Sequence, residues 1–224
     1  MNSAIIVAAG SGKRFGGKTP KQFLEIFGKP LIIHTLLRFE ACSEINEIIL
    51  VLPSQDNAKF LEIAGKYNLK KLSKVVAGGE TRAESVWKGL SAIRAATAEI
   101  VAVHDGARPL VSTEEIAETV KKARETGAAC LVSAVTDTIK EIKDGKIART
   151  VDRRVLRRAL TPQCFRYEIL KRAFENADLS EAVTDECFLV ERLGQQIATV
   201  EGSARNIKIT HPEDLILAEA FLEK

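Results

Sequence analysis

The sequence predicts an α/β fold with a doubly wound, mostly parallel β-sheet, and three observations support this class. Short apolar runs alternate with helical patterns along most of the 224 residues. The apolar runs are nearly continuous, as in strands that are covered on both faces. The connections between them are short, as in βαβ units. A hydrophobic content of 46% is enough for a large core, and we expect one domain over residues 1–224.

The first part of the chain contains the expected core strands. Each is a short run rich in β-branched or small apolar residues. In chain order the predicted strands are Ala4–Ala8, Glu47–Leu52, Lys74–Ala77, Ile100–His104 and Ala129–Ala134.

Helices are expected between these strands. A helix over residues 30–40 begins with a proline, which is well tolerated at a first helical position. Thr81 opens the T-x-x-E pattern of a capping box and begins the next helix. A third covers residues 112–124 and is ended by Gly127.

The pattern changes at about residue 136. Residues 138–143 and 146–151 alternate polar and apolar side chains around an Asp144-Gly145 turn, which predicts a β-hairpin. These strands differ from the core strands, so we interpret residues 136–153 as an inserted arm that packs on a second subunit. The βα pattern then resumes at Leu160–Phe165, Tyr167–Asn176, Ile197–Val200, Ile207–Thr210 and in a helix after Pro212.

Composition excludes several classes of function. The net charge is only +3 and no polybasic run is present, which argues against nucleic-acid binding. No apolar stretch reaches the length of a membrane span, and the N-terminus does not resemble a signal peptide. We therefore expect a cytoplasmic protein without a membrane partner. Its scattered cysteines are expected to be buried and reduced: Cys42, Cys130, Cys164 and Cys187.

A glycine-rich stretch after the first strand matches the P-loop pattern G-x-x-x-x-G-K-[ST] from Gly12 to Thr19. Two features argue against a P-loop. The expected strand ends near Ala8, well before the motif begins. Pro20 follows directly and disfavours a helix where a P-loop has one.

The same stretch has the properties of another kind of phosphate-binding loop. Lys13, Arg14, Lys18 and Lys21 place four cations within nine residues, beside a glycine-rich backbone whose N–H groups can cradle phosphate. They follow the carboxyl end of a strand, where open α/β sheets bind ligands. Asp105 ends another strand and could serve any Mg²⁺-nucleotide site.

A series of short motifs narrows this interpretation. They are AAGSGKRF (8–15), TPKQF (19–23), GKPLI (28–32), GGETRAESV (78–86), VHDGARP (103–109), TDT (136–138), TVDR (150–153), ALTPQ (159–163), TDE (184–186) and NIKIT (206–210). Their order and spacing resemble the nucleotidyltransferases that activate sugars and sugar alcohols, and most closely the 2-C-methyl-D-erythritol 4-phosphate cytidylyltransferase family of the non-mevalonate isoprenoid pathway.

The resemblance implies a Rossmann-like nucleotidyltransferase fold and the transfer of CMP from CTP to methylerythritol phosphate, with release of pyrophosphate. The acceptor's phosphate monoester is already an anionic nucleophile, so no Ser, Cys or His base is required. Catalysis then depends on positioning two polyanions and on neutralising charge with fixed cations and Mg²⁺.

The resemblance also implies roles for single residues. Arg14 and Lys21 would stabilise the transition state, Arg153 and Lys208 would position the acceptor, and Asp105 would lie near the ribose and Mg²⁺. The residues implied around the nucleotide are Ala8, Ala9, Gly10, Gly12, Gly79, Glu80 and Ser85. The remaining implied acceptor contacts are Arg108, Thr138, Thr161 and Thr184.

Two further expectations concern the arm and the metal. By resemblance Thr138 and Arg153 reach the site of a partner subunit, so the active protein would be a homodimer. Arg205 stands where an acidic residue is common in the family, which leaves Asp105 as the only carboxylate expected on Mg²⁺.

The roles of two further residues are judged from the sequence alone. Arg82 fits a surface charge and a site residue equally well. His104 is expected to be a buried, hydrogen-bonded histidine.

Three alternatives remain beside this interpretation. A ribitol-5-phosphate cytidylyltransferase would share the fold, the loop and the mechanism. A P-loop ATPase or GTPase would hydrolyse its nucleotide without an acceptor. A regulatory protein would bind CTP without turnover.

Overall fold

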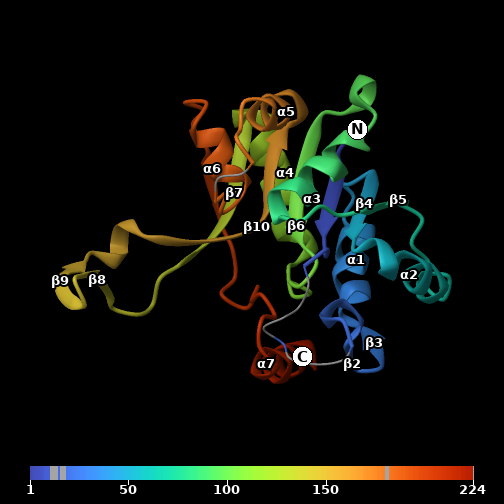
Figure 1. Ribbon diagram of the computed structural model, residues 1–224, viewed down its shortest axis with the longest axis horizontal. Coiled ribbons are helices and arrows are strands. Elements are labelled where there is room, and N and C mark those ends of the chain that lie inside the picture. Colours follow the sequence, from blue (N-terminus) through green and yellow to red (C-terminus); the bar gives the residue numbers. More distant parts are fainter. Residues whose placement is uncertain (11–14, 16–18, 180–181, 224) are drawn as a thin grey trace.

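A seven-stranded sheet forms the centre of the computed structural model, which describes residues 1–10, 15, 19–179 and 182–223 (Figure 1). Its strand order is β11-β7-β10-β6-β1-β4-β5. All neighbouring pairs are parallel except those of β10, which runs antiparallel to β6 and β7. The predicted α/β fold with a mostly parallel sheet is therefore confirmed. The strands are β1 (Ser3–Val7), β4 (Glu47–Leu52), β5 (Leu72–Ala77), β6 (Ile100–Asp105), β7 (Ala128–Ala134), β10 (Arg157–Arg166) and β11 (Ala198–Glu201).

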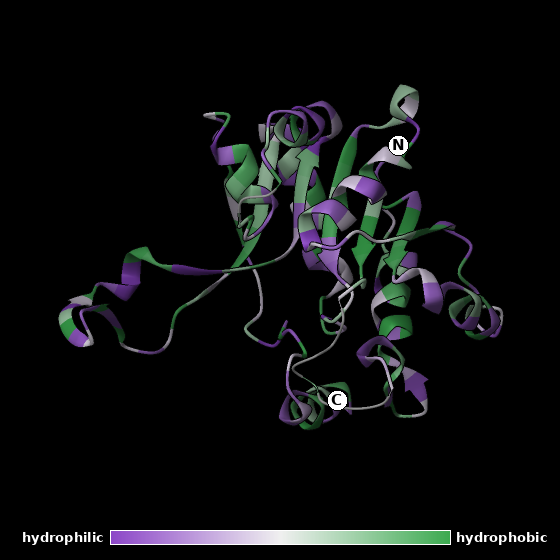
Figure 2. Ribbon diagram, in the orientation of Figure 1, coloured by the Kyte–Doolittle hydropathy of each residue, from purple (hydrophilic) through white to green (hydrophobic). Residues whose placement is uncertain are grey.

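Helices cover both faces of the sheet. One layer is α1 (Leu31–Ala41), α2 (Asn57–Ala64) and α4 (Thr113–Thr126), and the other is α3 (Arg82–Ser91), α5 (Tyr167–Glu175) and α6 (Glu186–Glu191). Alternate residues of β1 separate the two cores, since Ile6 belongs to the first and Ile5 to the second. Figure 2 shows the apolar colour concentrated in the central strands. Burial of these strands on both faces explains their nearly continuous apolar sequences.

The register of the central strands brings their carboxyl ends to one edge. Val7 lies opposite Val51 of β4 and opposite Asp105 of β6. The ladder continues for one residue, because the Ala8 N–H donates to the Val51 carbonyl and the Gly106 N–H donates to the Val7 carbonyl, both at 2.8 Å. The loops that follow β1 and β6 therefore begin side by side.

Local capping fixes where two helices begin at this edge. The Thr81 hydroxyl accepts from the Glu84 N–H at 3.1 Å and caps α3, as the T-x-x-E pattern predicts. Ser112 and Glu115 form a full capping box at the start of α4. Gly127 ends α4 with φ at +93°, a conformation that favours glycine.

The predicted hairpin is present and lies away from the main sheet (Figure 1). It consists of β8 (Ile139–Lys143) and β9 (Lys146–Val151), and Asp144 and Gly145 both have positive φ in the turn. Ile142 and Ile147 face each other across the hairpin and are 60% and 64% exposed. An exposed apolar pair on an isolated two-stranded ribbon leaves apolar surface uncovered.

Several elements differ from the prediction. The predicted strand at Ile207–Thr210 is irregular, because the Ile209 N–H donates to the Ala107 carbonyl of a loop rather than to a sheet edge. The helices α2 and α6 and the small hairpin of β2 (Glu25–Ile26) and β3 (Lys29–Pro30) were not predicted. The other elements are α7 (Pro212–Leu222) and the 3-10 turns Lys21–Phe23, Ser54–Asp56, Ala95–Thr97 and Arg153–Val155.

The segment after the glycine-rich stretch agrees with the argument against a P-loop. Pro20 has an extended backbone, with ψ at 136°, and only the single 3-10 turn Lys21–Phe23 follows it. The first α-helix in the described part of the chain begins at Leu31. The four cysteines are buried and free, as predicted. Among the described residues, no helix has the length and apolarity needed to cross a membrane.

Candidate active site

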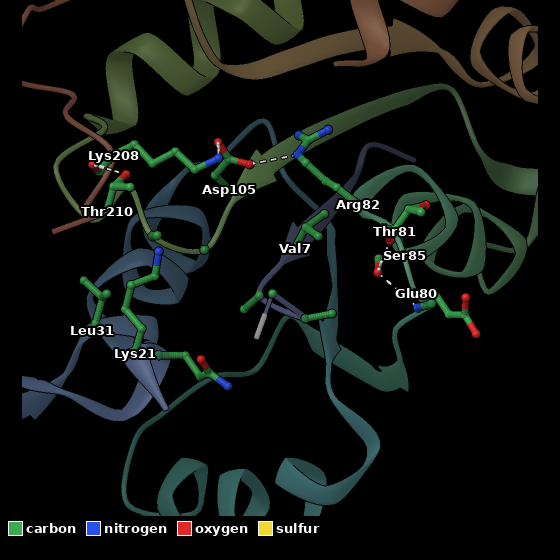
Figure 3. A pocket seen from close by; sticks show the side chains of 17 residues that line it. Val7, Lys21, Leu31, Glu80, Thr81, Arg82, Ser85, Asp105, Lys208 and Thr210 are labelled. Atoms are coloured by element: carbon green, nitrogen blue, oxygen red, sulfur yellow. Dashed lines mark hydrogen bonds and ion pairs between the residues drawn. The ribbon is translucent and has the colours of Figure 1, made fainter. Parts of the chain in front are cut away.

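A pocket of about 540 Å³ lies at the carboxyl edge of the central strands (Figure 3). Its walls come from the ends of β1 and β6, the start of α3, the turn at Lys21–Phe23 and the irregular segment near Thr210. Six residues expected around the nucleotide border it: Ala8, Ala9, Gly10, Gly79, Glu80 and Ser85. Three charged residues expected in the chemistry border it as well: Lys21, Asp105 and Lys208.

Small residues bring backbone to the surface of the pocket. A Cβ added to Gly78 would lie 2.3 Å from the Ala9 Cβ, and one added to Gly106 would lie 2.9 Å from the Ala8 Cβ. The loops after β5 and β6 therefore approach the β1 loop more closely than side chains would allow. A ligand at this place meets peptide groups rather than side chains.

The turn before α3 is held by side chains of that helix. The Ser85 hydroxyl accepts from the Gly79 N–H at 3.0 Å and donates to the Thr81 carbonyl at 2.9 Å. The Glu84 carboxylate accepts from the Glu80 N–H at 2.9 Å. The Ser85 hydroxyl thus holds this wall through one accepted and one donated bond.

Asp105 is surrounded by three cations. Its Oδ1 lies 3.1 Å from the Arg82 Nε, and its Oδ2 lies 2.9 Å from the Lys208 Nζ and 3.3 Å from the Arg108 Nε. Figure 3 shows Lys208 and Arg82 reaching Asp105 from opposite sides of the pocket. One carboxylate therefore joins β6, α3 and the segment before α7.

The protonation state of Asp105 follows from these contacts. Burial by itself raises the pKa of a carboxyl group, but the charges of Arg82, Lys208 and Arg108 outweigh it and hold the pKa of Asp105 well below its usual range. Burial likewise opposes the charge of Arg82, yet Glu186 and Asp105 raise its pKa. Asp105 and Arg82 are therefore both charged at neutral pH.

Lys21 and Gln22 line the pocket on the side opposite Asp105. The Lys21 Nζ donates to the Ile209 carbonyl at 2.7 Å, which draws the 3-10 turn toward the segment that carries Lys208. The adjacent Gln22 is buried, and its Nε2 donates to the Asp56 carboxylate at 2.6 Å. Both contacts hold the turn so that the Lys21 side chain extends into the pocket (Figure 3).

A buried polar group supports the end of β6 from behind. The His104 Nε2 lies 3.0 Å from the Arg108 carbonyl, which can only accept, so Nε2 carries the proton. The other nitrogen, Nδ1, then accepts from the Thr161 hydroxyl at 3.0 Å. That hydroxyl in turn accepts from the Asp105 N–H at 3.2 Å. His104 is thus the buried, hydrogen-bonded histidine that was expected.

Several predicted residues lie away from the pocket wall. Thr161 is buried behind Asp105, and Arg108 contacts Asp105 without bordering the pocket. Thr184 is exposed, just before α6. Thr138 and Arg153 are exposed at the base of the arm, where the Arg153 guanidinium donates to the Thr136 carbonyl. Gly12 and Arg14 lie outside the described residues.

Two residues gain importance from the structure. Arg82, which the sequence left undecided, borders the pocket. Glu186 was quoted only as part of the TDE motif, yet it is completely buried and contacts Arg82. A buried glutamate at the start of a helix has no distinctive sequence pattern, so its importance could not be read from the chain. Arg205 turns away, with its guanidinium over the Phe221 ring.

Comparison with known proteins identifies the family. The sequence model of IspD, 2-C-methyl-D-erythritol 4-phosphate cytidylyltransferase, matches residues 2–224. The chain belongs to this family. A 2-C-methyl-D-erythritol 4-phosphate cytidylyltransferase of Bacillus licheniformis is 44% identical over 100% of this chain and 96% of its own length. One from Clostridium perfringens is 43% identical and covers 98% of each chain.

Solved structures of the family have the same fold. The 4-diphosphocytidyl-2C-methyl-D-erythritol synthase of Anaerococcus prevotii superposes with a TM-score of 0.87 at 32% identity, over 100% of this chain and 96% of that one. The 2-C-methyl-D-erythritol 4-phosphate cytidylyltransferase of Thermus thermophilus gives a TM-score of 0.79 at 34% identity over 100% of both chains. The resemblance read from the motifs is confirmed, and the protein is a cytidylyltransferase.

The buried histidine predicts how the stability of this cytidylyltransferase depends on pH. Burial lowers the pKa of His104 to about 4, from 6.5 in a model compound. The folded state therefore favours the neutral ring, and this contribution is complete above pH 6.5 and lost as the pH falls toward 4. The loss amounts to at most about 3 kcal/mol. The stability contribution of Asp105, whose pKa in the folded protein lies well below 3.8, is lost mainly below that pH.

Urea unfolding at a series of pH values checks this. The free energy of unfolding of the wild type should fall between pH 6.5 and 4, and His104→Gln should reduce that slope, while His34, whose pKa is also lowered by burial, keeps a share of it. A variant whose slope equals that of the wild type would contradict the assignment.

Proposed function

We propose that the pocket beside Asp105 is the place where the chain carries out the reaction of its family. The protein transfers CMP from CTP to 2-C-methyl-D-erythritol 4-phosphate and releases pyrophosphate, a step of non-mevalonate isoprenoid biosynthesis. One observation carries the assignment to this pocket: Lys21, Arg82 and Lys208 converge on a cradle of small residues at the carboxyl edge of the sheet. Fixed cations of this kind suit a triphosphate.

The cytidine half of CTP fits the wall between β1 and α3. Ala8, Ala9 and Gly10 offer backbone groups at one side, and the turn of Gly79 and Glu80 offers them at the other. Backbone donors and acceptors can read the edge of a base, and these loops approach each other closely here. In this proposal Ser85 shapes the wall, and Asp105 approaches the ribose.

The reaction itself needs charge more than it needs a base. As the acceptor's phosphate oxygen attacks the α-phosphorus of CTP, negative charge grows on the oxygens of the α-phosphate, and pyrophosphate leaves. In this proposal Lys21 stabilises that charge, since it extends into the pocket from a turn that the side-chain contacts of Lys21 and Gln22 hold in place. Arg14, which lies in the glycine-rich loop, has the same proposed role.

The residues present also fit one divalent cation, which we infer to be Mg²⁺. Mg²⁺ in nucleotide sites is usually held by one or two carboxylates together with phosphate oxygens. Asp105 supplies one carboxylate, and among the described residues the ion-pair partner of its Oδ1 is Arg82. When bound, the ion would neutralise triphosphate charge, with Asp105 as its protein ligand.

The acceptor fits on the far side of Asp105 from α3. Lys208 borders the pocket there and is 37% exposed at its side chain, so it can turn from Asp105 to an incoming phosphate. We propose Arg108 and Thr184 as neighbouring acceptor contacts. Thr161 is buried beneath them and, in this proposal, contributes chiefly through His104 and the backbone of Asp105.

The arm supports the proposal of a homodimer. Ile142, Ile147 and Val155 are 60%, 64% and 79% exposed, an apolar surface that a second subunit would cover. Thr138 and Arg153 belong to the same arm and do not border the pocket of their own chain. Figure 1 shows the hairpin β8–β9 of this arm projecting away from the sheet. We infer that they complete the acceptor site of the partner.

We infer that residues 1–224 form a single nucleotidyltransferase domain with an arm at about residues 136–153. We also infer a cytoplasmic location, for which the four buried, free cysteines are suited.

An assay of pyrophosphate release tests the function. Each of the four nucleoside triphosphates is supplied with Mg²⁺, with and without methylerythritol phosphate. Release should occur with CTP and require the acceptor. Ribitol 5-phosphate serves as the matched control acceptor and should be a much poorer substrate. Equal or faster release with ribitol 5-phosphate, or nucleotide hydrolysis without any acceptor, would contradict the proposal.

Mixing two inactive variants tests the shared site. Arg153→Ala removes the arm contact, and Lys21→Ala removes the cation from the pocket. If Arg153 acts in the partner's pocket, a heterodimer of the two variants contains one intact site. An equal mixture that has exchanged subunits should recover about a quarter of the wild-type rate. No recovery in a mixture shown to contain heterodimers would mean that Arg153 acts within its own chain, and a fully active Arg153→Ala variant would remove Arg153 from the site.

A further inference from the structure

We propose that Glu186 is a positioning residue for CTP binding: it holds the guanidinium of Arg82 in the pocket wall and so keeps Asp105 available to the nucleotide. The proposal rests on the proposed function of the pocket and adds to it a residue that does not border the pocket.

The guanidinium of Arg82 and the carboxylate of Glu186 are joined by two hydrogen bonds. The Arg82 Nη1 lies 2.6 Å from the Glu186 Oε1, and the Nη2 lies 3.0 Å from the Oε2. This bidentate pairing fixes the plane of the guanidinium. The remaining nitrogen, Nε, is then directed at Asp105, at 3.1 Å. Arg82 therefore offers Asp105 one N–H group instead of two.

Glu186 is itself held rigidly. Its N–H and that of Cys187 both donate to the Gln163 Oε1, each at 3.1 Å. The Gln163 Nε2 donates to Asp185 at 2.8 Å, and Asp185 caps α6 through the N–H of Phe188 at 2.9 Å. Gln163 belongs to β10, the antiparallel strand beside β6. The carboxylate of Glu186 thus has a fixed position relative to the strand that ends in Asp105.

Stability alone is a weak reason for such a pair. Desolvation of a buried ion pair costs about as much as the attraction returns, and apolar residues of similar volume often serve the fold equally well. The ion pair also has a consequence that an apolar pair would not supply. It fixes Arg82, the first residue of α3 on the nucleotide side, to α6, which follows the proposed acceptor contact Thr184.

Removing the Glu186 charge would redirect Arg82. Glu186→Gln would keep only one oxygen that can accept from Arg82, so one terminal nitrogen would lose its partner in a site where the Arg82 side chain is only 25% exposed. The neighbouring carboxylate in contact with Arg82 is Asp105. A guanidinium that turned toward it would form a bidentate pair and occupy the oxygen atoms that CTP requires.

A double-mutant cycle tests this with Glu186→Gln, Arg82→Ala and the combined variant. The readouts are the KM for CTP and kcat of pyrophosphate release, together with the Kd of CTP from calorimetry. Glu186→Gln should weaken CTP binding roughly ten- to a hundredfold, as expected for a charged hydrogen bond. The combined variant should bind CTP no worse than Arg82→Ala alone, because Glu186→Gln lowers the affinity for CTP only by changing the position of Arg82.

A matched control is Glu44→Gln. Glu44 pairs with Arg124 at 2.9 Å near the opposite end of the strands, and its loss should leave the KM for CTP unchanged. If Glu186→Gln does not fold, Glu186→Asp keeps the charge but withdraws the oxygens, and it should raise the KM for CTP in the same direction.

Two results would overturn the proposal. One is an unchanged CTP affinity in a folded Glu186 variant that has merely lost stability. The other is additive losses in the cycle. Failure of the wild type to release pyrophosphate from CTP and methylerythritol phosphate would instead refute the proposed function.

Discussion

The carboxylate of Asp105, held by Arg82, Arg108 and Lys208, is the interaction on which the site depends. It lies at the end of β6 beside β1, where the register of the sheet brings two loops together. The three cations come from different parts of the chain, and one anion holds them at a single place. Without that anion their mutual repulsion would spread them apart. The surrounding contacts of His104 and Glu186 fix this carboxylate and its partners in turn.

Much of the fold could be predicted because it follows from local chemistry. Buried parallel strands require continuous apolar runs, so β1, β4 and β6 were visible in the sequence. The capping pattern at Thr81 and the Asp144-Gly145 turn depend on a few neighbouring residues. The antiparallel direction of β10 depends on where a distant segment pairs, and the irregular path near Ile209 on a hydrogen bond to Ala107. No local pattern contains that information.

The residues of the site also divide into those found from local patterns and those brought in by distant segments of the chain. Lys21, Asp105 and the residues of the β1 loop were found because loops after parallel strands meet at one edge. Lys208 was found only through the family motif, since an irregular segment brings it there. Glu186 could not be found, because its importance comes from a contact made 104 residues away in the chain. Whether Arg153 belongs to the site depends on a second subunit, which no single chain contains.

The most direct test of the account is the kinetic effect of Asp105→Asn, which keeps the shape of the side chain and removes its charge. We expect kcat/KM for CTP to fall at least about a hundredfold in a folded protein, because the cations lose the anion that orients them. A kcat/KM within about twofold of the wild type would show that Asp105 does not organise the site.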